Sequence, residues 1–350
     1  MTLTTGKLDR QTMARVVFPS TGRPSRRVLL GPGRGLDNAV VSVGGARRML
    51  MTTDPVSIVP SLGMKASAWL SVHLIASDYT TSGLKPEFAT FTYNLPRELR
   101  LSDAEDYLRS VGRECARLGV TVVAGHTGSY PGGGFTVVGG GTMFGFCYEG
   151  DYVDPTMALP GDAILMTKGA AIEAATMLAR SFPEYVGRTA GRAAYGRARR
   201  RLRECSTVKD ALTASSLGLG PGGVTSMHDA TEGGVLGGLE EMADASKTAF
   251  VVEVARVHVA TDCLAICRAF KIDPLTTVSE GSLLLTCNAA RVEELQAKLV
   301  RRGIPAHQIG SVRKGRGLWV KGAEGSEQRA AAAADRYWAA YERSVRAGLR

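Results

Sequence analysis

The chain has 350 residues, of which 44% are hydrophobic and 22% are charged, a composition typical of a soluble globular protein with room for two domain cores. The first residues carry no apolar signal region, and no apolar run approaches the roughly 18 residues of a membrane span. We therefore expect a cytoplasmic protein with no membrane partner.

The formal net charge of +10 raises the question of nucleic-acid binding. Its main source is the arginine-rich segment 187–205, which we interpret as a solvated helix face or a surface for phosphorylated ligands. No known nucleic-acid-binding motif accompanies it, so we expect no nucleic acid partner. The six cysteines form neither a CxxC pair nor a disulfide framework. Cys263 and Cys267, four residues apart, are expected to be buried thiols on one helix face.

The first half of the chain alternates segments with strand-like and helix-like periodicity. We expect helices at 67–83 and 102–119, and Ser102 stands three residues before Glu105, which predicts a capping box. Glycines at 139–141 predict bends or close backbone approach in a long strand. Strands are expected at 47–54, 88–96, 120–125 and 131–148.

The second half repeats this alternation after a turn-rich linker at 148–162. Strands are expected near 163–169, 250–255 and 282–287, with further short strands up to Val320. Helices are expected at 170–182, around Cys263–Cys267, at 290–302 and in the tail. The pattern predicts an α+β fold divided into domains 1–155 and 156–322, followed by a helical tail at 323–350.

One helix has an unusual start. An apolar stripe predicts that it runs from about Val235 to Ala243, yet Gly233 and Gly234 precede it and cost about 1 kcal/mol each in helix propensity. Two interpretations are open. The segment is either a tight turn with Asp229 or Thr231 as N-cap, or a bare helix start that lets phosphate approach the backbone.

Four aspartates lie at the ends of predicted apolar strands or helices, where loops meet in α/β architectures: Asp37, Asp54, Asp78 and Asp229. Singly, such residues are turn formers or caps. Together, beside glycine-rich turns, they predict a site for Mg²⁺, which takes oxygen ligands and is commonly shared with nucleotide phosphates. Lys7, on a glycine turn, either reaches a phosphate as a point charge or belongs to a disordered basic terminus.

His126 follows a predicted strand and is either a structural hydrogen-bonding residue or part of a cleft. The chain has no Walker A sequence and no GxGxxG that opens a helix after the first strand, which argues against P-loop and Rossmann sites. It also lacks a GxSxG nucleophile elbow, so a serine-hydrolase site has no support.

Several segments resemble, in the correct order from residue 5 to about 313, motifs of one superfamily. Its members include aminoimidazole ribonucleotide synthetase, selenophosphate synthetase, thiamine-monophosphate kinase and the hydrogenase maturation protein HypE, to which the resemblance is closest. The segments are TTGKL, LDNAVV, MTTDP, LIASDYTTSG, VVAGHTGSYPG, MHDATEGGVLGGLEEMA and FKIDPLTTVSEGSLLL.

The resemblance implies an AIR-synthetase-like fold whose N-terminal domain dimerises, with ATP at the subunit interface and a C-terminal domain closing over it. It implies ATP and Mg²⁺ as cofactors, and phosphorylation of a carbonyl, carbamoyl or amide oxygen that drives dehydration or cyclisation. By position, it assigns metal binding to Asp37, Asp54, Asp78 and Asp229, catalysis to Lys7, His126 and Asp229, and cofactor binding to Thr53, Asp54, Gly125, Thr127, Gly233 and Gly234.

Departures from the family pattern leave the acceptor open. HypE carries a C-terminal cysteine that bears its carbamoyl group, whereas this chain has no cysteine after Cys287. Ser77, His126 and Glu232 also replace typical family residues. We expect a small-molecule or carbamoylated substrate and a maturation partner protein. The alternatives are a phosphotransferase like thiamine-monophosphate kinase or selenophosphate synthetase, and a non-catalytic nucleotide-binding scaffold.

The sequence also predicts a homodimer through the N-terminal domain. The apolar strands at 47–54 and 135–148 would have exposed edges unless they paired across two subunits. The alternative is a sheet closed within one chain by the helix at 102–119.

Overall fold

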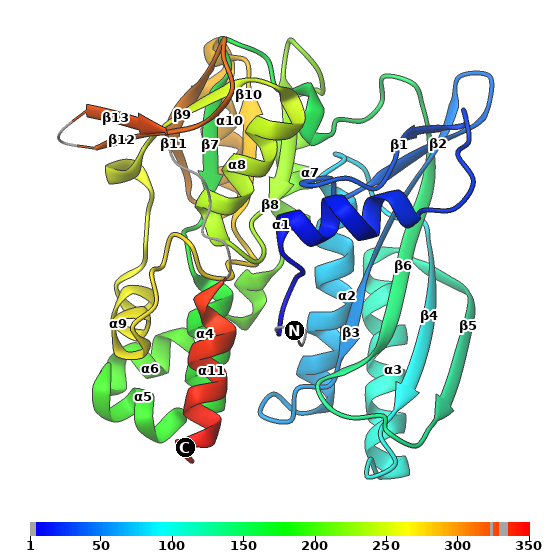
Figure 1. The fold of residues 1–350 in the computed structure, drawn as a ribbon, viewed down its shortest axis with the longest axis vertical. Coiled ribbons are helices and arrows are strands. Elements are labelled where there is room, and N and C mark those ends of the chain that lie inside the picture. The colour runs from blue at the N-terminus through cyan, green and yellow to red at the C-terminus, as the bar shows by residue number, and fades with distance from the viewer. Residues whose placement is uncertain (1–4, 323–324, 329–334) are drawn as a thin grey trace.

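The computed structural model describes residues 5–322, 325–328 and 335–350. They form two sheets, each with its own helices, and the predicted two-domain α+β fold is confirmed (Figure 1). The predicted boundaries at 155 and 322 stay predictions. Within the described residues, no helix is long and apolar enough to cross a membrane.

The N-terminal sheet has the strand order β1-β2-β3-β6-β4-β5. Its strands β3 and β6 pair antiparallel along most of their length, so both lie inside the sheet. The prediction that these two strands have exposed edges is therefore wrong, because each pairs with the other and with a further strand; β1 and β5 form the edges. The strands are β1 Val28–Leu30, β2 Ala39–Gly44, β3 Arg47–Ser57, β4 Phe88–Leu95, β5 Thr121–Ser129 and β6 Val137–Tyr148.

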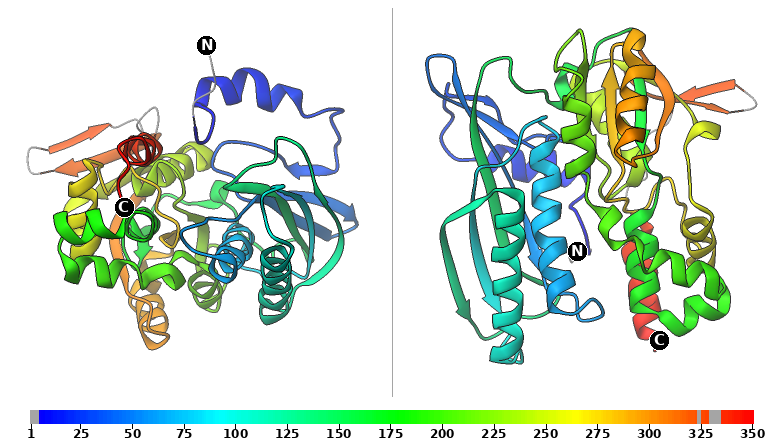
Figure 2. Two further views of the ribbon diagram at one scale, coloured as in Figure 1. Left: turned by 90° about the horizontal axis from the view of Figure 1, so that it is seen from below. Right: turned by 180° about the vertical axis from the view of Figure 1, so that it is seen from behind.

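Helices α2 (Met64–Thr80) and α3 (Leu101–Leu118) pack on one face of this sheet, as the right-hand view of Figure 2 shows. The predicted capping box is wrong, because α3 begins at Leu101 and Ser102 already lies inside the helix. Arg100 is the N-cap residue, and its guanidinium pairs with Asp103 in the first turn.

The C-terminal sheet has the order β13-β12-β9-β11-β7-β10-β8. Helix α8 (Gly234–Ser246) packs on one face, and α7 (Val208–Ser215) with α10 (Val292–Arg301) packs on the other. The strands are β7 Ala163–Thr167, β8 Val224–Asp229, β9 Ala249–Glu253, β10 Leu283–Cys287, β11 Ala306–Arg313, β12 Gly317–Gly322 and β13 Gly325–Gln328.

A helical lobe extends from this domain, and its apolar cluster also includes Trp69 and Leu70 of α2. The arginine-rich segment 187–205 is not one helix, because it is divided among the end of α5, α6 and a 3-10 turn. Cys263 and Cys267 are buried in the lobe, as expected. Its helices are α4 Ile172–Ser181, α5 Pro183–Thr189, α6 Arg192–Ala198, α9 Thr261–Phe270 and α11 Arg336–Arg346.

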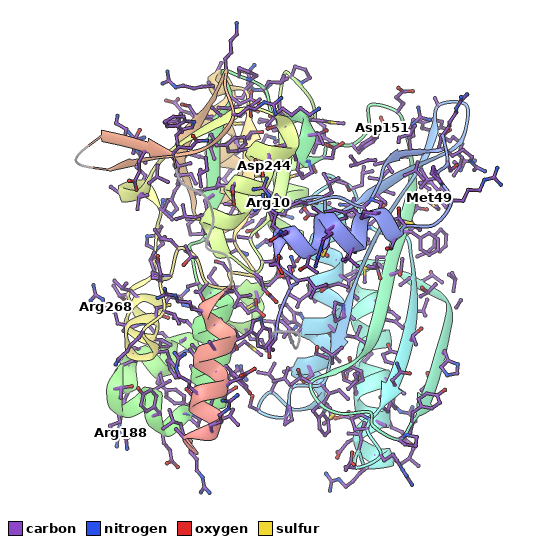
Figure 3. The ribbon with its side chains drawn as sticks, in the orientation of Figure 1. Arg10, Met49, Asp151, Arg188, Asp244 and Arg268 are labelled. Atoms are coloured by element: carbon purple, nitrogen blue, oxygen red, sulfur yellow. The ribbon has the colours of Figure 1, made fainter. Side chains whose placement is uncertain are left out.

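The N-terminal segment crosses from the first domain toward α8. Its short helix α1 (Arg10–Thr12) is followed by a π-helical turn (Met13–Val17) and a 3-10 turn (Phe18–Ser20). The Arg10 guanidinium lies 3.1 Å from the Asp244 carboxylate of α8, and Figure 3 shows the two side chains facing each other. Further 3-10 turns are Pro155–Met157, Arg201–Cys205, Val254–Arg256 and Ala289–Arg291.

Candidate functional site

The four predicted aspartates come from different elements and meet between the two domains. Asp54 lies in β3, Asp78 in the last turn of α2, and Asp229 at the end of β8, while Asp37 precedes β2. Burial raises the pKa of Asp78 well above its usual range, and the charges of the other three aspartates add to the rise. The structure thus brings all four carboxylates within electrostatic reach of one another.

Asp229 is the most constrained member of this cluster. It is fully buried, and neither of its carboxylate oxygens has a hydrogen-bond partner among the described residues. Burial, together with the Asp37 carboxylate, raises the pKa of Asp229 to about 7 despite the nearby His228. An isolated buried carboxylate is costly unless it is paired or bound to a metal, so these oxygens fit a cation ligand.

Asp54 titrates under opposing influences. Burial raises its pKa to about 6, against the lowering effect of the Lys7 ammonium. For Lys7 itself, burial lowers the pKa, but the carboxylates of Glu241, Asp78 and Asp54 raise it more. The lysine therefore stays cationic beside the cluster, where it can hold an anion as a point charge.

Lys7 is fixed by two contacts to the turn that precedes α8. Its ammonium donates to the Thr231 hydroxyl at 2.8 Å, and its backbone N–H donates to the Glu232 carboxylate at 2.8 Å. The other Glu232 oxygen accepts from the indole N–H of Trp338 in α11 at 3.0 Å. Glu232 thus joins the N-terminal segment to the C-terminal helix over the site.

His228 belongs to the cluster and was missed as a site residue. Its Nδ1 lies 2.7 Å from Asp37 Oδ1, and its Nε2 lies 3.2 Å from Glu241 Oε2. Burial lowers the pKa of His228, but these two carboxylates raise it more, to about 10. Side-chain atoms of Asp37, His228 and Asp229 lie within 4.8 Å of one another, which places the protonated His228 ring against the two carboxylates. In the sequence, the feature that could have identified His228 as a site residue is its position next to Asp229.

Two buried glutamates were also missed. Burial, with the charge of Asp229 next in importance, raises the pKa of Glu280 well above its usual range, and burial raises the pKa of Glu173 to about 8. One oxygen of each carboxyl has no hydrogen-bond partner among the described residues. Glu280 stands in the segment VSEGSLLL, whereas nothing in the sequence around Glu173, in the first turn of α4, indicated a site.

The glycine pair has a structural reason of its own. Gly233 is the N-cap of α8, with φ of 87°, and no side chain caps this helix, so the interpretation of Asp229 or Thr231 as N-cap is wrong. Gly234 has φ of 64°, and a Cβ there would lie 2.6 Å from a backbone oxygen of Thr277. Glycine is needed for both the left-handed conformation and the close approach.

The N-terminus of α8 already binds a carboxylate of this chain, that of Asp335. The Gly233 N–H donates to the Asp335 carboxylate at 3.1 Å, and the second Asp335 oxygen accepts from Thr277 Oγ1 at 3.2 Å and from the Tyr337 N–H at 2.8 Å. A phosphate could contact the Gly233 amide only by displacing Asp335. The cofactor-binding role of the two glycines stays a prediction.

The remaining predicted residues lie outside this cluster within one chain. Gly125, His126 and Thr127 are in the edge strand β5, and the exposed His126 has its Nε2 2.6 Å from the Tyr130 hydroxyl. Thr53 donates to the Gly141 carbonyl at 3.0 Å in the sheet. Their catalytic and cofactor-binding roles stay predictions.

The geometry describes a two-domain α+β protein that gathers buried carboxylates, one lysine and one histidine between its domains, an arrangement typical of sites for a hard cation with an anionic ligand. The chain belongs to the AIR synthase related family. The N-terminal domain of that family matches residues 35–147, and its C-terminal domain matches residues 160–321.

Comparisons with individual proteins agree with this family. Carbamoyl dehydratase HypE from Cupriavidus necator is 28% identical over 290 residues, covering 80% of this chain and 77% of the relative. The fold is similar to three solved structures. AaThiL complexed with AMPPCP and TMP has a TM-score of 0.69 at 18% identity, covering 91% of this chain and 95% of that one. HypE in complex with ATP has a TM-score of 0.66 at 21% identity, covering 94% of this chain and 96% of that one. The HypE-HypF complex has a TM-score of 0.70 at 18% identity, covering 92% of this chain and 99% of that one.

Proposed function

We propose that this chain is an ATP-dependent, Mg²⁺-using enzyme that phosphorylates a carbonyl, carbamoyl or amide oxygen and so drives dehydration or cyclisation. The observation that carries the proposal is the buried Asp229 carboxylate, which has no partner among the described residues and lies beside other carboxylates. Family membership supports it, as do the relative named carbamoyl dehydratase and the similar fold of a HypE bound to ATP.

In this proposal the four aspartates would hold Mg²⁺, which when bound neutralises phosphate charge and polarises the transferred phosphoryl group. Lys7 would contact a phosphate oxygen, since its ammonium already points to the turn before α8. His228 would orient Asp37 through their short contact and keep a positive charge behind the carboxylates. Without the positive charge of Lys7 or of His228, the remaining carboxylates would repel a phosphate more strongly.

The acceptor is a separate molecule in this proposal. The last cysteine of the chain is Cys287, and helix α11 is packed into the helical lobe through Tyr337 and Ala340. Asp335, just before this helix, is bound to Gly233. Residues 335–350 therefore offer no thiol to the site, and in this proposal a small or carbamoylated substrate, or one presented by a maturation partner, enters it.

We place a homodimer at the helix-free face of the N-terminal sheet. Phe88, Phe144 and Phe146 form an aromatic group in which the ring centroids of Phe88 lie 5.5 and 6.5 Å from those of the other two. Phe146 and Tyr148 are exposed there. Burying this face against a second copy would also bring a second β5, with Gly125, His126 and Thr127, near a subunit interface that binds ATP.

A phosphotransferase is the second candidate, favoured by the similar fold of AaThiL complexed with AMPPCP and TMP. A non-catalytic scaffold is the third, favoured by the Asp335 carboxylate that occupies the start of α8. ATP labelled in its γ-phosphate separates these functions. Label in an organic product indicates a kinase, label in inorganic phosphate alone indicates dehydration or cyclisation, and bound nucleotide without turnover indicates a scaffold.

The direct test is ATP turnover with candidate amide and carbamoyl acceptors, with and without Mg²⁺, in the wild type and in Asp54→Asn. Asp106→Asn, in α3, is a matched control, since the Asp106 side chain is 46% exposed and lies 4.0 Å from the Lys65 ammonium. We expect turnover to require Mg²⁺ and to fall in Asp54→Asn alone. Equal turnover in all three proteins would defeat the metal assignment.

A further inference from the structure

A cavity of about 550 Å³ lies where the two domains meet, on the other side of the C-terminal sheet from α8. Five of its lining residues are basic: Lys85, from the loop between α2 and β4; Lys209, in α7; and Lys298, Arg301 and Arg302, at the end of α10. It shares no lining residue with the carboxylate cluster, and no acidic residue lines it.

The charges around this cavity are only partly offset within the described parts of the chain, by the electrostatic interaction of Glu294 with Lys298 and Arg301 and of Asp210 with Lys209. Lys85, Lys298, Arg301 and Arg302 form no ion pair there, and the nearby Glu294 of α10 accepts from Arg291 at 2.8 Å. The Lys209 ammonium donates to the Arg302 carbonyl at 2.6 Å, which uses one of its three N–H groups. Most of the N–H donors at the cavity therefore stay available.

The dipole of α10 accounts for only part of this arrangement. Basic side chains in the last turn of a helix are stabilised by its C-terminal partial charge, which explains Lys298 and Arg301. It does not explain Lys85, which the other domain contributes. Gathering like charges from two domains is unfavourable unless an anion offsets their repulsion.

We propose that this cavity binds a small, multiply charged phosphate-bearing anion held by both domains. Its volume falls within the roughly 300–1,000 Å³ of small-molecule pockets, and lysine and arginine are the side chains that bind phosphate most strongly. A neighbouring cavity of about 150 Å³ shares Lys85 and adds Arg117 and Ala76. Ala76 lies two residues from Asp78 on α2, so an occupant would contact the helix that carries a carboxylate of the main site.

The test uses inorganic tripolyphosphate, titrated calorimetrically into the full chain at low salt in buffer freed of divalent cations by a chelating resin. Without divalent cations the carboxylate cluster repels phosphate, so binding reports the basic cavity. We expect one site per chain and a loss of about tenfold or more in affinity in the double variant Lys298→Ala/Arg301→Ala. Lys314→Ala/Lys321→Ala, which removes the same charge from exposed positions elsewhere, should bind as the wild type does.

The proposal would be overturned by no tripolyphosphate binding, by equal weakening in the cavity variant and the control, or by loss of binding in Lys7→Ala, which would place the anion at the main site. Lys85→Ala, in the other domain, must weaken binding as well and serves if the double variant does not fold. Binding of a single-stranded oligonucleotide without tripolyphosphate would show a nucleic-acid surface instead and would also defeat the proposal.

Discussion

The two domains cover their sheets differently. In the C-terminal sheet, strands β7, β8 and β10 are buried along their whole length, with α8 on one face and α7 and α10 on the other. In the N-terminal sheet, helices cover one face only, and Phe146 and Tyr148 stay 38% and 60% exposed on the other. The C-terminal domain therefore has helices on both faces of its sheet, whereas the N-terminal domain leaves one face of its sheet uncovered.

This difference extends to the site between them. The C-terminal domain contributes Asp229, which is fully buried, whereas Asp54 and Asp78 of the N-terminal domain are partly accessible. Clustering these carboxylates destabilises the fold unless a cation offsets the repulsion. The two domains therefore leave two features to test: the buried carboxylates, at which we propose a cation, and the uncovered sheet face, at which we propose a second subunit.

The largest effect should come from Asp229→Asn. We expect Mg²⁺-dependent ATP turnover to fall about a hundredfold or more, because a metal ligand is lost. The same variant should unfold at a higher temperature than the wild type in metal-free buffer, because a neutral amide replaces a fully buried carboxyl that the Asp37 carboxylate repels. Turnover assays and thermal unfolding check both effects; an active variant, or one of lower stability, would contradict the assignment.

The open sheet face is tested next, by Phe146→Glu. Charge in an apolar interface should shift the protein from a dimer toward the 37.1 kDa monomer at low micromolar concentration. Val300→Glu, at an apolar position on α10 that is 60% exposed, is the control and should leave the dimer intact. Light scattering after gel filtration gives the masses, and a monomeric wild type with cooperative folding would defeat both the dimer and the shared-interface ATP site.

A smaller effect is expected from Glu232→Ala. This change removes the carboxylate that holds the Lys7 N–H and the Trp338 indole, so Lys7 would be less well positioned. We expect KM for ATP to rise about fivefold with little change in kcat, since only binding is weakened. Glu293→Ala, exposed on α10, should match the wild type in steady-state kinetics. An unchanged KM in Glu232→Ala would show that this contact does not position the lysine.

The smallest effect concerns pH. The folded-state pKa values of Asp54 and Asp229, about 6 and 7, exceed the ordinary values of unfolded aspartates. Stability from these groups is therefore fully present below about pH 4 and is lost as the pH rises through 6 and 7. In metal-free buffer we expect the unfolding temperature to fall by a few degrees between pH 5 and pH 8. Asp229→Asn should flatten this slope and Asp106→Asn should keep it; a slope of opposite sign would contradict the pKa directions.

Local signals in the sequence predicted much of the fold but not its boundaries. Periodicity placed α2 close to its observed position, although the helix starts at Met64 after a glycine that provides no side-chain cap. Strand β5 was predicted to end at Gly125 and continues to Ser129, because β4 pairs with it along its whole length. Pairing between distant segments, not local composition, decides such ends.

The site residues also divide into those that local sequence predicted and those that only the meeting of distant segments reveals. The four aspartates could be named from their places at the ends of elements, and the structure brings them together. His228 and Glu280 stood beside recognised motif residues but became site residues only when β8, β10 and the first domain met. The carboxylate that binds the start of α8 could not be predicted, because the Gly233 N–H donates to Asp335, about a hundred residues further along the chain.

In the proposed function, carboxylates of both domains bind one metal ion together with a nucleotide. The most direct measurement is an electron paramagnetic resonance titration of Mn²⁺, in place of Mg²⁺, in the presence of the non-hydrolysable nucleotide AMPPCP. We expect nucleotide-dependent Mn²⁺ binding that is lost in Asp54→Asn, from the first domain, and equally in Asp229→Asn, from the second. Wild-type Mn²⁺ affinity in either variant, with Asp106→Asn as the reference, would contradict a site shared by the two domains.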